Sequence, residues 1–318
     1  MRALITGAGG FVGRYLCEYL LAQSDWELLG TVYPEPAEAS RPQPYLSLVP
    51  LDLRDTGRVG ELIGDFRPDV VFHLAAQSHV PSSFADPWQT LENNLRAQLN
   101  VLEGVRRAGL SSRVIVIGSN EEYGWPRPED LPLTEESPLR PVNPYAISKV
   151  GQDFMGLQYH LAYGMDVLRL RPFNHTGPGQ APHFVVPAFA RQIARIEAGL
   201  QEPVVRVGNL EVARDFTDVR DIVRAYYMAA VAGEPGEVYN LASGRAHSIR
   251  WILETLLSFT DAEVRIEVDP ALYRPADASI IYGSAEKFRC RTGWEPRIPF
   301  EQTLRETLDY WRRLCQEP

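Results

Sequence analysis

The sequence predicts an α/β fold in which helices cover both faces of a parallel sheet. Through the first half of the chain, apolar runs rich in β-branched residues alternate with segments of helical periodicity. The runs are almost continuously apolar, as in strands buried on both sides. A glycine-rich segment stands between the first run and the first helix. Together these observations are typical of a doubly wound, Rossmann-type sheet.

The expected strands are short apolar runs bounded by turn-forming residues. They cover residues 2–6, 27–32, 47–51, 69–75, 113–119 and 166–171. The expected helices cover residues 11–23, 55–66, 88–108, 144–163, 184–198, 218–232, 248–258 and 301–314. From about residue 172 the loops lengthen and the strands shorten. We therefore expect a Rossmann domain over 1–171 and a smaller substrate-binding α/β lobe over 172–318, with some later segments returning to the first sheet.

The composition is that of an ordinary globular protein, with 45% hydrophobic and 23% charged residues. A formal net charge of −9 argues against broad nucleic-acid binding. No apolar run approaches the roughly 18 residues of a membrane span, and the N-terminus has no signal-peptide pattern. Cys17, Cys290 and Cys315 form neither a metal-binding spacing nor an even set for disulfides. We expect a cytoplasmic protein without a metal site.

Three glycines, Gly7, Gly10 and Gly13, stand in TGAGGFVGRYL after the first strand. Glycines at such a turn allow the backbone to approach a pyrophosphate and allow the helix to pack closely on the strand. The N-terminus of the helix, with Phe11 and Val12, offers free N–H groups and the positive end of the helix dipole. A plain turn is the alternative. The position at the start of a βαβ unit favours a dinucleotide site.

The choice between NAD and NADP stays open. Tyr33 stands where an acidic residue would bind a ribose 2′-hydroxyl, and Glu35 follows two residues later. Arg14 or Arg41 could reach a 2′-phosphate. After the third strand, Asp52 and Leu53 are expected either to contact the adenine or to cap the strand end.

A tyrosine and a lysine stand four residues apart in NPYAISK, which puts Tyr145 and Lys149 on one face of a helix. Of the 32 basic residues only Lys149 and Lys287 are lysines, which indicates that Lys149 is needed as a lysine. A nearby ammonium lowers the pKa of a phenol and allows it to exchange protons near neutrality. The alternative is a surface pair of no catalytic importance.

Over essentially its full length the chain resembles the extended short-chain dehydrogenase/reductases. The motifs that carry the resemblance are TGAGGFVG, DLRD at 52–55, HLAA at 73–76, GSNEEYG at 118–124, PYAISK at 144–149 and RPFNHTGPG at 171–179. The resemblance implies a catalytic set of Ser119, Tyr145 and Lys149. It also implies further cofactor contacts at Leu74, Ala75, Ala76 and Asn94, the last supporting the lysine through water.

The second half is similar to two groups of this family, the GDP-6-deoxy-D-mannose reductases and the GDP-mannose 4,6-dehydratases. VGNLEVARDF resembles both groups, TGPGQ the reductases and AAQSHVPSSFADP the dehydratases. The resemblance implies a GDP-sugar substrate, with a guanidinium fork well suited to its phosphates. The implied substrate contacts beyond the catalytic set are Asn174, Asn209, Glu211, Arg214, Arg274 and Asp277. His175, in the FNHTGPG loop, is a further candidate for lining the substrate pocket, with a structural role as the alternative.

As a reductase, the protein would use NAD(P)H to reduce the C4 ketone of GDP-4-dehydro-6-deoxy-D-mannose to GDP-D-rhamnose. Tyr145 would supply the proton, and Ser119 a hydrogen bond to the same oxygen. As a dehydratase, it would need a second acid/base, a role that the resemblance assigns to Glu121. A C4 epimerase, and a binding protein that has lost catalysis, are further alternatives.

The resemblance also implies a homodimer in which helices 88–108 and 144–163 pair across a two-fold axis. The second helix carries more apolar surface than one inner face requires, at Ile147, Val150, Phe154, Leu157 and Leu161.

Overall fold

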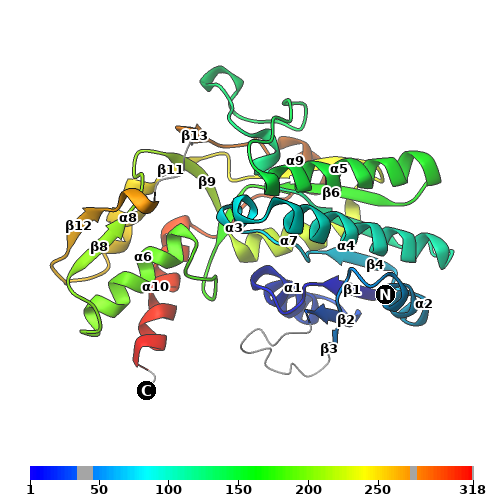
Figure 1. Ribbon diagram of the computed structural model, residues 1–318, viewed down its shortest axis with the longest axis horizontal. Coiled ribbons are helices and arrows are strands. Elements are labelled where there is room, and N and C mark those ends of the chain that lie inside the picture. The colour runs from blue at the N-terminus through cyan, green and yellow to red at the C-terminus, as the bar shows by residue number, and fades with distance from the viewer. Residues whose placement is uncertain (34–45, 273–277, 317–318) are drawn as a thin grey trace.

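The structure is a computed structural model that describes residues 1–33, 46–272 and 278–316 (Figure 1). Its centre is a parallel sheet of seven strands in the order β10-β6-β5-β4-β1-β2-β3. The strands are β1 (Arg2–Thr6), β2 (Glu27–Val32), β3 (Leu46–Pro50), β4 (Val70–His73), β5 (Arg113–Ile117), β6 (Val167–Pro172) and β10 (Val238–Leu241). The predicted doubly wound fold is confirmed, and six of these strands lie where the sequence placed them, with ends that differ by at most two residues.

Helices cover both faces of this sheet. One face packs against α1 (Phe11–Gln23) and α7 (Val219–Ala232), and the other against α2 (Thr56–Phe66), α4 (Pro87–Arg107) and α5 (Pro144–Tyr163). Successive strand residues point to opposite faces, so Ile5 lies in the core on the α1 side and Leu4 in the core on the α4 side. This double burial explains why the strands read as continuous apolar runs.

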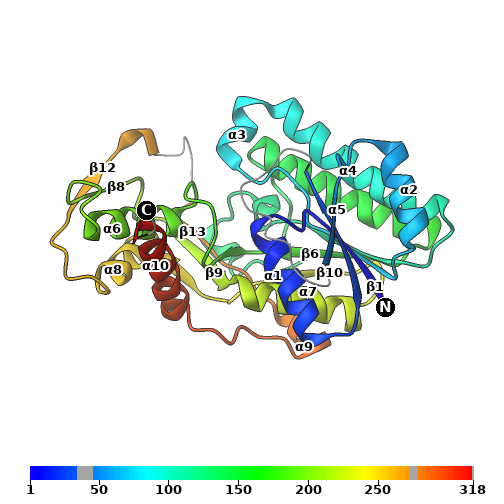
Figure 2. The ribbon, with the colours of Figure 1, turned by 90° about the horizontal axis from the view of Figure 1, so that it is seen from below.

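The second lobe has a hydrophobic core of its own. Its helices α6 (Val185–Glu197), α8 (Ile249–Leu257) and α10 (Phe300–Gln316) pack together and against short strands. The short strands in this half of the chain are β7 (Asn174–Thr176), β8 (Val204–Val207), β9 (Ala213–Asp218), β11 (Ala246–Ser248), β12 (Arg265–Val268) and β13 (Ile280–Ile281). Of these, β8 and β9 contribute side chains to this core. Figure 2 shows this lobe at one end of the molecule and α2, α4 and α5 at the other.

The chain does not stay in the second lobe after residue 172. Helix α7 returns to cover the main sheet, and β10 extends that sheet by pairing with β6. The main sheet therefore includes segments from both sides of residue 172. The domain boundary at this residue stays a prediction. The sequence did not predict two short helices, α3 (Val80–Ala85) and α9 (Glu286–Thr292), or the 3-10 helices η1 (Asn120–Tyr123), η2 (Pro128–Asp130) and η3 (Pro270–Leu272).

The sheet order determines where a ligand can bind. From β1 the chain adds β2 and β3 on one side, and then crosses to β4, β5, β6 and β10 on the other. Loops that leave the carboxyl ends of β1 and β4 therefore separate and leave a crevice, the usual ligand site of such sheets. Within the described ranges, no helix is long and apolar enough to span a membrane.

Candidate active site

The glycine loop that joins β1 to α1 is packed so closely that a side chain would not fit at Gly7 or Gly13. Gly7 has a left-handed backbone with φ of +73°, and a Cβ there would lie 3.1 Å from the main-chain N and Cα of Ala75. A Cβ at Gly13 would lie 2.2 Å from the carbonyl oxygen of Gly7. Gly10 is the N-cap of α1 and has no side chain to cover the first turn. The first N–H groups of α1, at Phe11 and Val12, therefore have no N-cap side chain bonded to them, as a phosphate site at a helix N-terminus requires.

A buried contact holds this loop against the loop that follows β4. The Thr6 Oγ1 and His73 Nδ1 atoms lie 3.0 Å apart, and the main-chain N–H of Ala75 donates to the same Thr6 oxygen at 3.2 Å. Burial, with a smaller contribution from the charge of Lys149, lowers the pKa of His73 to about 3, so this histidine is neutral. Leu74, Ala75 and Ala76 are thereby fixed beside the glycine loop.

The adenosine end of the predicted cofactor site is polar. Tyr33 directly follows β2 and is 55% exposed. Asp52 binds Arg54 through Nε at 3.0 Å and Nη2 at 2.7 Å, and a hydrogen bond from the Arg54 side chain is the main reason that the pKa of Asp52 is lowered. Leu53 is buried, and its carbonyl oxygen accepts from Asn100 at 2.8 Å.

Sequence reasoning missed Arg54, whose Nη2 lies 3.4 Å from the Tyr33 hydroxyl. The DLRD motif contained the signal, because Asp52 and Arg54 are close enough in sequence to form an ion pair. Two alternatives considered at this end, Glu35 and Arg41, lie outside the described residues.

The structure brings the three predicted catalytic side chains together. Ser119 directly follows β5, and Tyr145 and Lys149 lie in the first turns of α5. The Ser119 side chain lies near enough to Tyr145 to lower the pKa of its hydroxyl. Lys149 Nζ donates to the carbonyl oxygen of Ile117 at 2.8 Å and lies 5.9 Å from the centre of the Tyr145 ring.

The Tyr145 pKa differs from the sequence prediction. Burial raises it, the nearby Ser119 hydroxyl lowers it, and the charges of Glu121 and Glu122 raise it further. The lowering by the lysine that the sequence predicted is not found, because burial outweighs every effect that lowers this pKa. Burial also lowers the pKa of Lys149 to about 8, and the charge of Glu122 partly offsets this effect.

Glu121 lies in η1, directly beside this catalytic set. Its Oε2 accepts a hydrogen bond from Nδ2 of Asn143 at 2.9 Å, and its charge raises the pKa of Tyr145. Ser119 caps the same short helix, because its Oγ accepts from the main-chain N–H of Glu121 at 3.2 Å. Glu121 thus lies against Ser119 and near enough to Tyr145 for its charge to act on the hydroxyl.

Asn94 is fully buried on α4 and ties three segments together. Its Oδ1 accepts from the N–H of Gln77 at 2.8 Å, and its Nδ2 donates to Ser148 Oγ of α5 at 2.9 Å. Its carbonyl oxygen accepts from Gln152 at 3.0 Å. Asn94 thus fixes the loop after β4 against α5, whereas the expected link to Lys149 through water stays a prediction.

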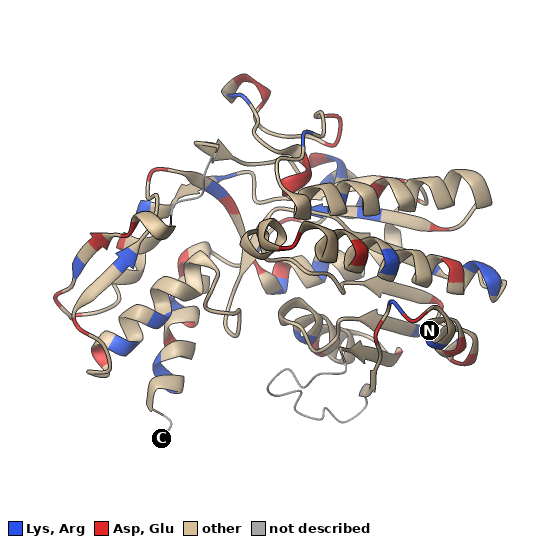
Figure 3. Cartoon of the chain, in the orientation of Figure 1, with Lys and Arg blue, Asp and Glu red and all other residues tan. Residues whose placement is uncertain are grey.

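Three predicted substrate residues lie on two paired strands, Asn174 and His175 on β7 and Arg214 on β9. The side-chain nitrogen of Asn174 is buried and has no hydrogen-bond partner among the described residues. His175 bonds the carbonyl of Phe173 through Nδ1 at 3.0 Å, and burial lowers its pKa. Arg214 is 8% exposed on β9 and donates to the carbonyl of Ala213 at 2.7 Å. Figure 3 shows basic and acidic positions side by side on β9, between the two parts of the molecule.

The contacts of two further predicted substrate residues, Asn209 and Glu211, are with other residues of the second lobe. Asn209 accepts from the N–H of Glu211 at 3.0 Å, and the Glu211 carboxylate pairs with Arg250 at 2.5 Å. Arg274 and Asp277 lie outside the described residues.

Known proteins match the whole chain. The family model described as GDP-mannose 4,6 dehydratase matches residues 4–307. The chain is 39% identical to the GDP-6-deoxy-D-mannose reductase of Pseudomonas aeruginosa, over 99% of each chain. It is 29% identical to GDP-mannose 4,6 dehydratase 2 of Arabidopsis thaliana, over 96% of this chain and 86% of that protein.

Two solved structures have the same fold. RMD from Pseudomonas aeruginosa, complexed with NADPH, matches with a TM-score of 0.87 and 38% identity over 98% of this chain and 99% of that one. The UDP-glucose 4-epimerase of Thermus thermophilus, in complex with NAD, matches with a TM-score of 0.87 and 30% identity over the same shares. The chain therefore belongs to the GDP-mannose 4,6-dehydratase family of extended short-chain dehydrogenase/reductases.

Proposed function

We propose that the protein is an NAD(P)H-dependent reductase of the C4 ketone in GDP-4-dehydro-6-deoxy-D-mannose, with GDP-D-rhamnose as product. The observation that carries the chemistry is the grouping of Ser119, Tyr145 and Lys149 at the carboxyl end of β5, where Lys149 Nζ donates to the carbonyl oxygen of Ile117 and lies 5.9 Å from the centre of the Tyr145 ring. The full-length similarity to a GDP-6-deoxy-D-mannose reductase supports the substrate.

The cofactor would lie over the crevice between the loops after β1 and β4. Gly7, Gly10 and Gly13 pack closely on neighbouring backbone, so the helix begins tightly against the strand, and the pyrophosphate would lie at this turn. Tyr33, Asp52 and Leu53 stand at the adenosine end, and Arg54 adds a cation there that suits a 2′-phosphate. When bound, NADPH or NADH supplies the hydride that reduces the sugar ketone.

The side chains of the chain supply the proton and the polar contacts. Tyr145 donates its hydroxyl proton to the C4 oxygen as negative charge develops there, and Ser119 donates a hydrogen bond to the same oxygen. The raised pKa keeps the Tyr145 hydroxyl protonated at neutral pH, but it also makes the hydroxyl a weaker acid, so the phenolate needs a cation nearby. Lys149, held by Ile117, stabilises the phenolate that the proton transfer leaves behind.

The GDP moiety would extend from the catalytic set to the second lobe. The buried, unpartnered amide nitrogen of Asn174 supports a ligand contact, because leaving such a donor without a partner is costly. Arg214 on β9 is proposed to pair with the diphosphate, together with Arg274, and Asp277 to bind the ribose. Asn209, Glu211 and His175 are proposed to line the base and sugar parts of the pocket.

A 4,6-dehydratase is the second candidate, and the position of Glu121 favours it. In that reaction a carboxylate removes the C5 proton after C4 has been oxidised. The effect of the Glu121 charge on Tyr145 supports the nearness of the two groups that the reaction requires.

Two incubations distinguish the candidates. The reductase converts GDP-4-dehydro-6-deoxy-D-mannose with oxidation of one NADPH or NADH for each sugar, which absorbance at the reduced-nicotinamide band follows. The dehydratase forms the ketone from GDP-mannose without net consumption of cofactor. Ketone formation from GDP-mannose, with no oxidation of reduced cofactor by the ketone, would exclude the reductase.

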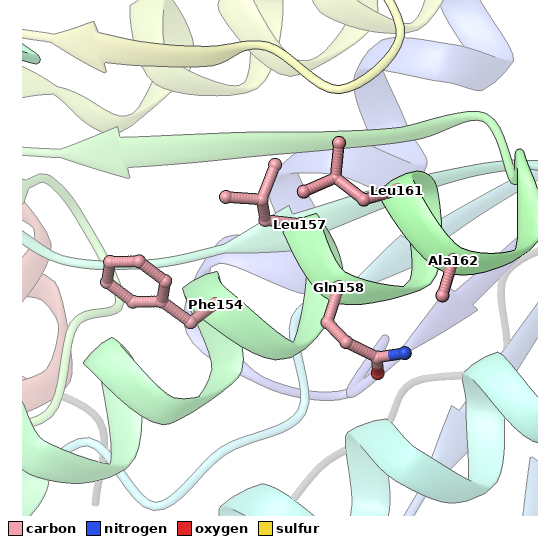
Figure 4. A pocket seen from close by; sticks show the side chains of 5 residues that line it. All are labelled: Phe154, Leu157, Gln158, Leu161 and Ala162. Carbon is pink, nitrogen blue, oxygen red and sulfur yellow. The ribbon is translucent and has the colours of Figure 1, made fainter.

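We also propose a homodimer through α4 and α5. Helix α5 exposes Phe154 by 52% and Leu161 by 74%, and these side chains lie on one face with Leu157, beside a shallow hollow (Figure 4). Exposed apolar patches of this kind mark interaction surfaces. Light scattering at micromolar concentration is expected to give twice the chain mass, and Leu161→Glu is expected to give the monomer. A cytoplasmic location is proposed as well, supported by the three cysteines being free thiols.

A further inference from the structure

A fully buried carboxylate, Glu122, lies beneath the catalytic set and has no place in the mechanism above. It belongs to η1 and has no exposed surface. Its Oε1 accepts a hydrogen bond from the main-chain N–H of Ser119 at 2.7 Å. Its Oε2 lies 3.2 Å from Nε of Arg171 on β6. A charge is rarely buried so completely unless its partners hold it.

Glu122 and Lys149, which can carry opposite charges, bind the same short stretch of main chain. Lys149 Nζ binds the carbonyl oxygen of Ile117, and Glu122 binds the N–H of Ser119, so the two contacts lie on either side of Gly118. The carboxylate is close under this stretch, because a Cβ at Gly118 would lie 2.3 Å from its Oε1. The end of β5 is thus fixed by an anion and by the catalytic cation.

We propose that Glu122 is a positioning residue, whose negative charge keeps the buried Lys149 protonated and whose carboxylate orients Ser119. The proposal rests on the proposed function, since it assigns Lys149 and Ser119 to catalysis. It adds an acidic group that acts through both of them and touches neither substrate nor cofactor.

Several charged or titratable groups surround Glu122 and Lys149 and influence their pKa values. Asp153 of α5 and Arg171 of β6 face Glu122, Tyr145 lies on the side of the substrate, and His73 of β4 lies near Lys149. Arg171 Nε also binds Asp153 at 2.9 Å, which holds the guanidinium between the two carboxylates. Burial, and then the charge of Asp153, raise the pKa of Glu122, while burial lowers that of Lys149 to about 8. Both pKa values lie near 8, so Glu122 becomes charged in the range where Lys149 would lose its proton, and there each charge stabilises the other.

The scarcity of lysine allows a direct test. With lysine labelled by ¹³C at Cε, the protein gives two lysine signals in NMR spectra, and Lys287→Arg identifies the one from Lys149. Glu122→Gln keeps an oxygen that can accept from Ser119 but removes the charge. In this variant the titration midpoint of Lys149 is expected to move to lower pH by about one pH unit or more. An unchanged midpoint would overturn the proposal.

Two further variants keep the test decisive. Glu122→Leu removes the charge with an apolar side chain, which buried sites often accept, and it is expected to move the midpoint in the same direction should Glu122→Gln fail to fold. Glu135→Gln is the matched control. Its carboxylate accepts from the N–H of Asn240 at 2.7 Å, in the region that also contacts Arg171, and its loss is expected to leave the Lys149 midpoint in place.

Activity gives a second readout. In Glu122→Gln the alkaline limb of kcat/KM against pH is expected to move to lower pH with the lysine midpoint. An equal loss of activity at every pH, with the limb unmoved, would show a structural role alone and contradict the proposal. A protein that did not reduce the ketone at all would refute the proposed function, but the NMR titration would still decide the coupling of Glu122 and Lys149.

Discussion

Asn143 donates a hydrogen bond from Nδ2 to Oε2 of Glu121 at 2.9 Å. Its Oδ1 accepts from the main-chain N–H of Ala146 at 2.7 Å, which makes Asn143 the N-cap of α5. One side chain thus fixes both the helix that carries Tyr145 and the carboxylate beside it. The two ends of the amide have separable tasks, and substitutions can remove them one at a time.

Asn143→Ser is expected to keep the cap, because serine is a good N-cap residue, and to lose the donor to Glu121. Asn143→Ala loses both and is expected to lower the free energy of unfolding by about 1 kcal/mol relative to the serine variant. Urea unfolding measures the difference. Equal stability of the two variants would mean that the cap contributes nothing.

Tyr145→Phe removes the proposed proton donor without changing the shape of the core. General acid catalysis contributes roughly 10²- to 10⁴-fold, and the reduction rate is expected to fall by a factor in this range. The affinity for NADPH, followed by its fluorescence, is expected to stay the same. A variant that keeps full activity would remove Tyr145 from the mechanism.

Gly13→Ala tests the cofactor cradle. The new methyl group would stand 2.2 Å from the carbonyl oxygen of Gly7, so the loop must open. We expect the dissociation constant for NADPH to rise at least about tenfold, which corresponds to about 1.4 kcal/mol. Gly64→Ala is the control, since a Cβ on that α2 residue meets nothing within 4 Å. Tight cofactor binding by Gly13→Ala would argue against a pyrophosphate at this loop.

Acid is expected to destabilise the protein through His73. Its folded-state pKa of about 3 lies below the ordinary value of 6.5, so between these values the unfolded chain binds a proton that the folded protein does not. The resulting stability is present above pH 6.5 and is lost as the pH falls, at a slope of up to about 1.4 kcal/mol per pH unit. His73→Asn can still donate to Thr6 but does not titrate. Unfolding measured from pH 7 to pH 4 is expected to show a shallower slope for this variant than for His160→Asn, a histidine outside the site. Equal slopes would contradict the assignment.

Much of the fold followed from local pattern. The strands and helices up to residue 171, the glycine loop and the Tyr145–Lys149 pair all rest on spacing within a few residues, and hydrophobic periodicity reports such spacing. The short elements α3 and α9 were missed because they are only six and seven residues long and give too little periodicity. The return of β10 to the main sheet was foreseen in outline only, since its pairing with β6 joins residues that lie far apart in the chain.

By itself, then, the sequence determined the fold class and predicted a dinucleotide site at the glycine loop, and its resemblance to a known family supplied the catalytic side chains that are proposed. Tertiary structure decided their chemical state. Burial raises the pKa of Tyr145, lowers that of Lys149 and leaves His73 neutral. It also set Arg54 beside Tyr33, Asn143 against Glu121, and Glu122 under the end of β5. The physical reason is that a pKa depends on desolvation and on charges brought close by packing, and both come from residues distant in the chain, where no local spacing records them.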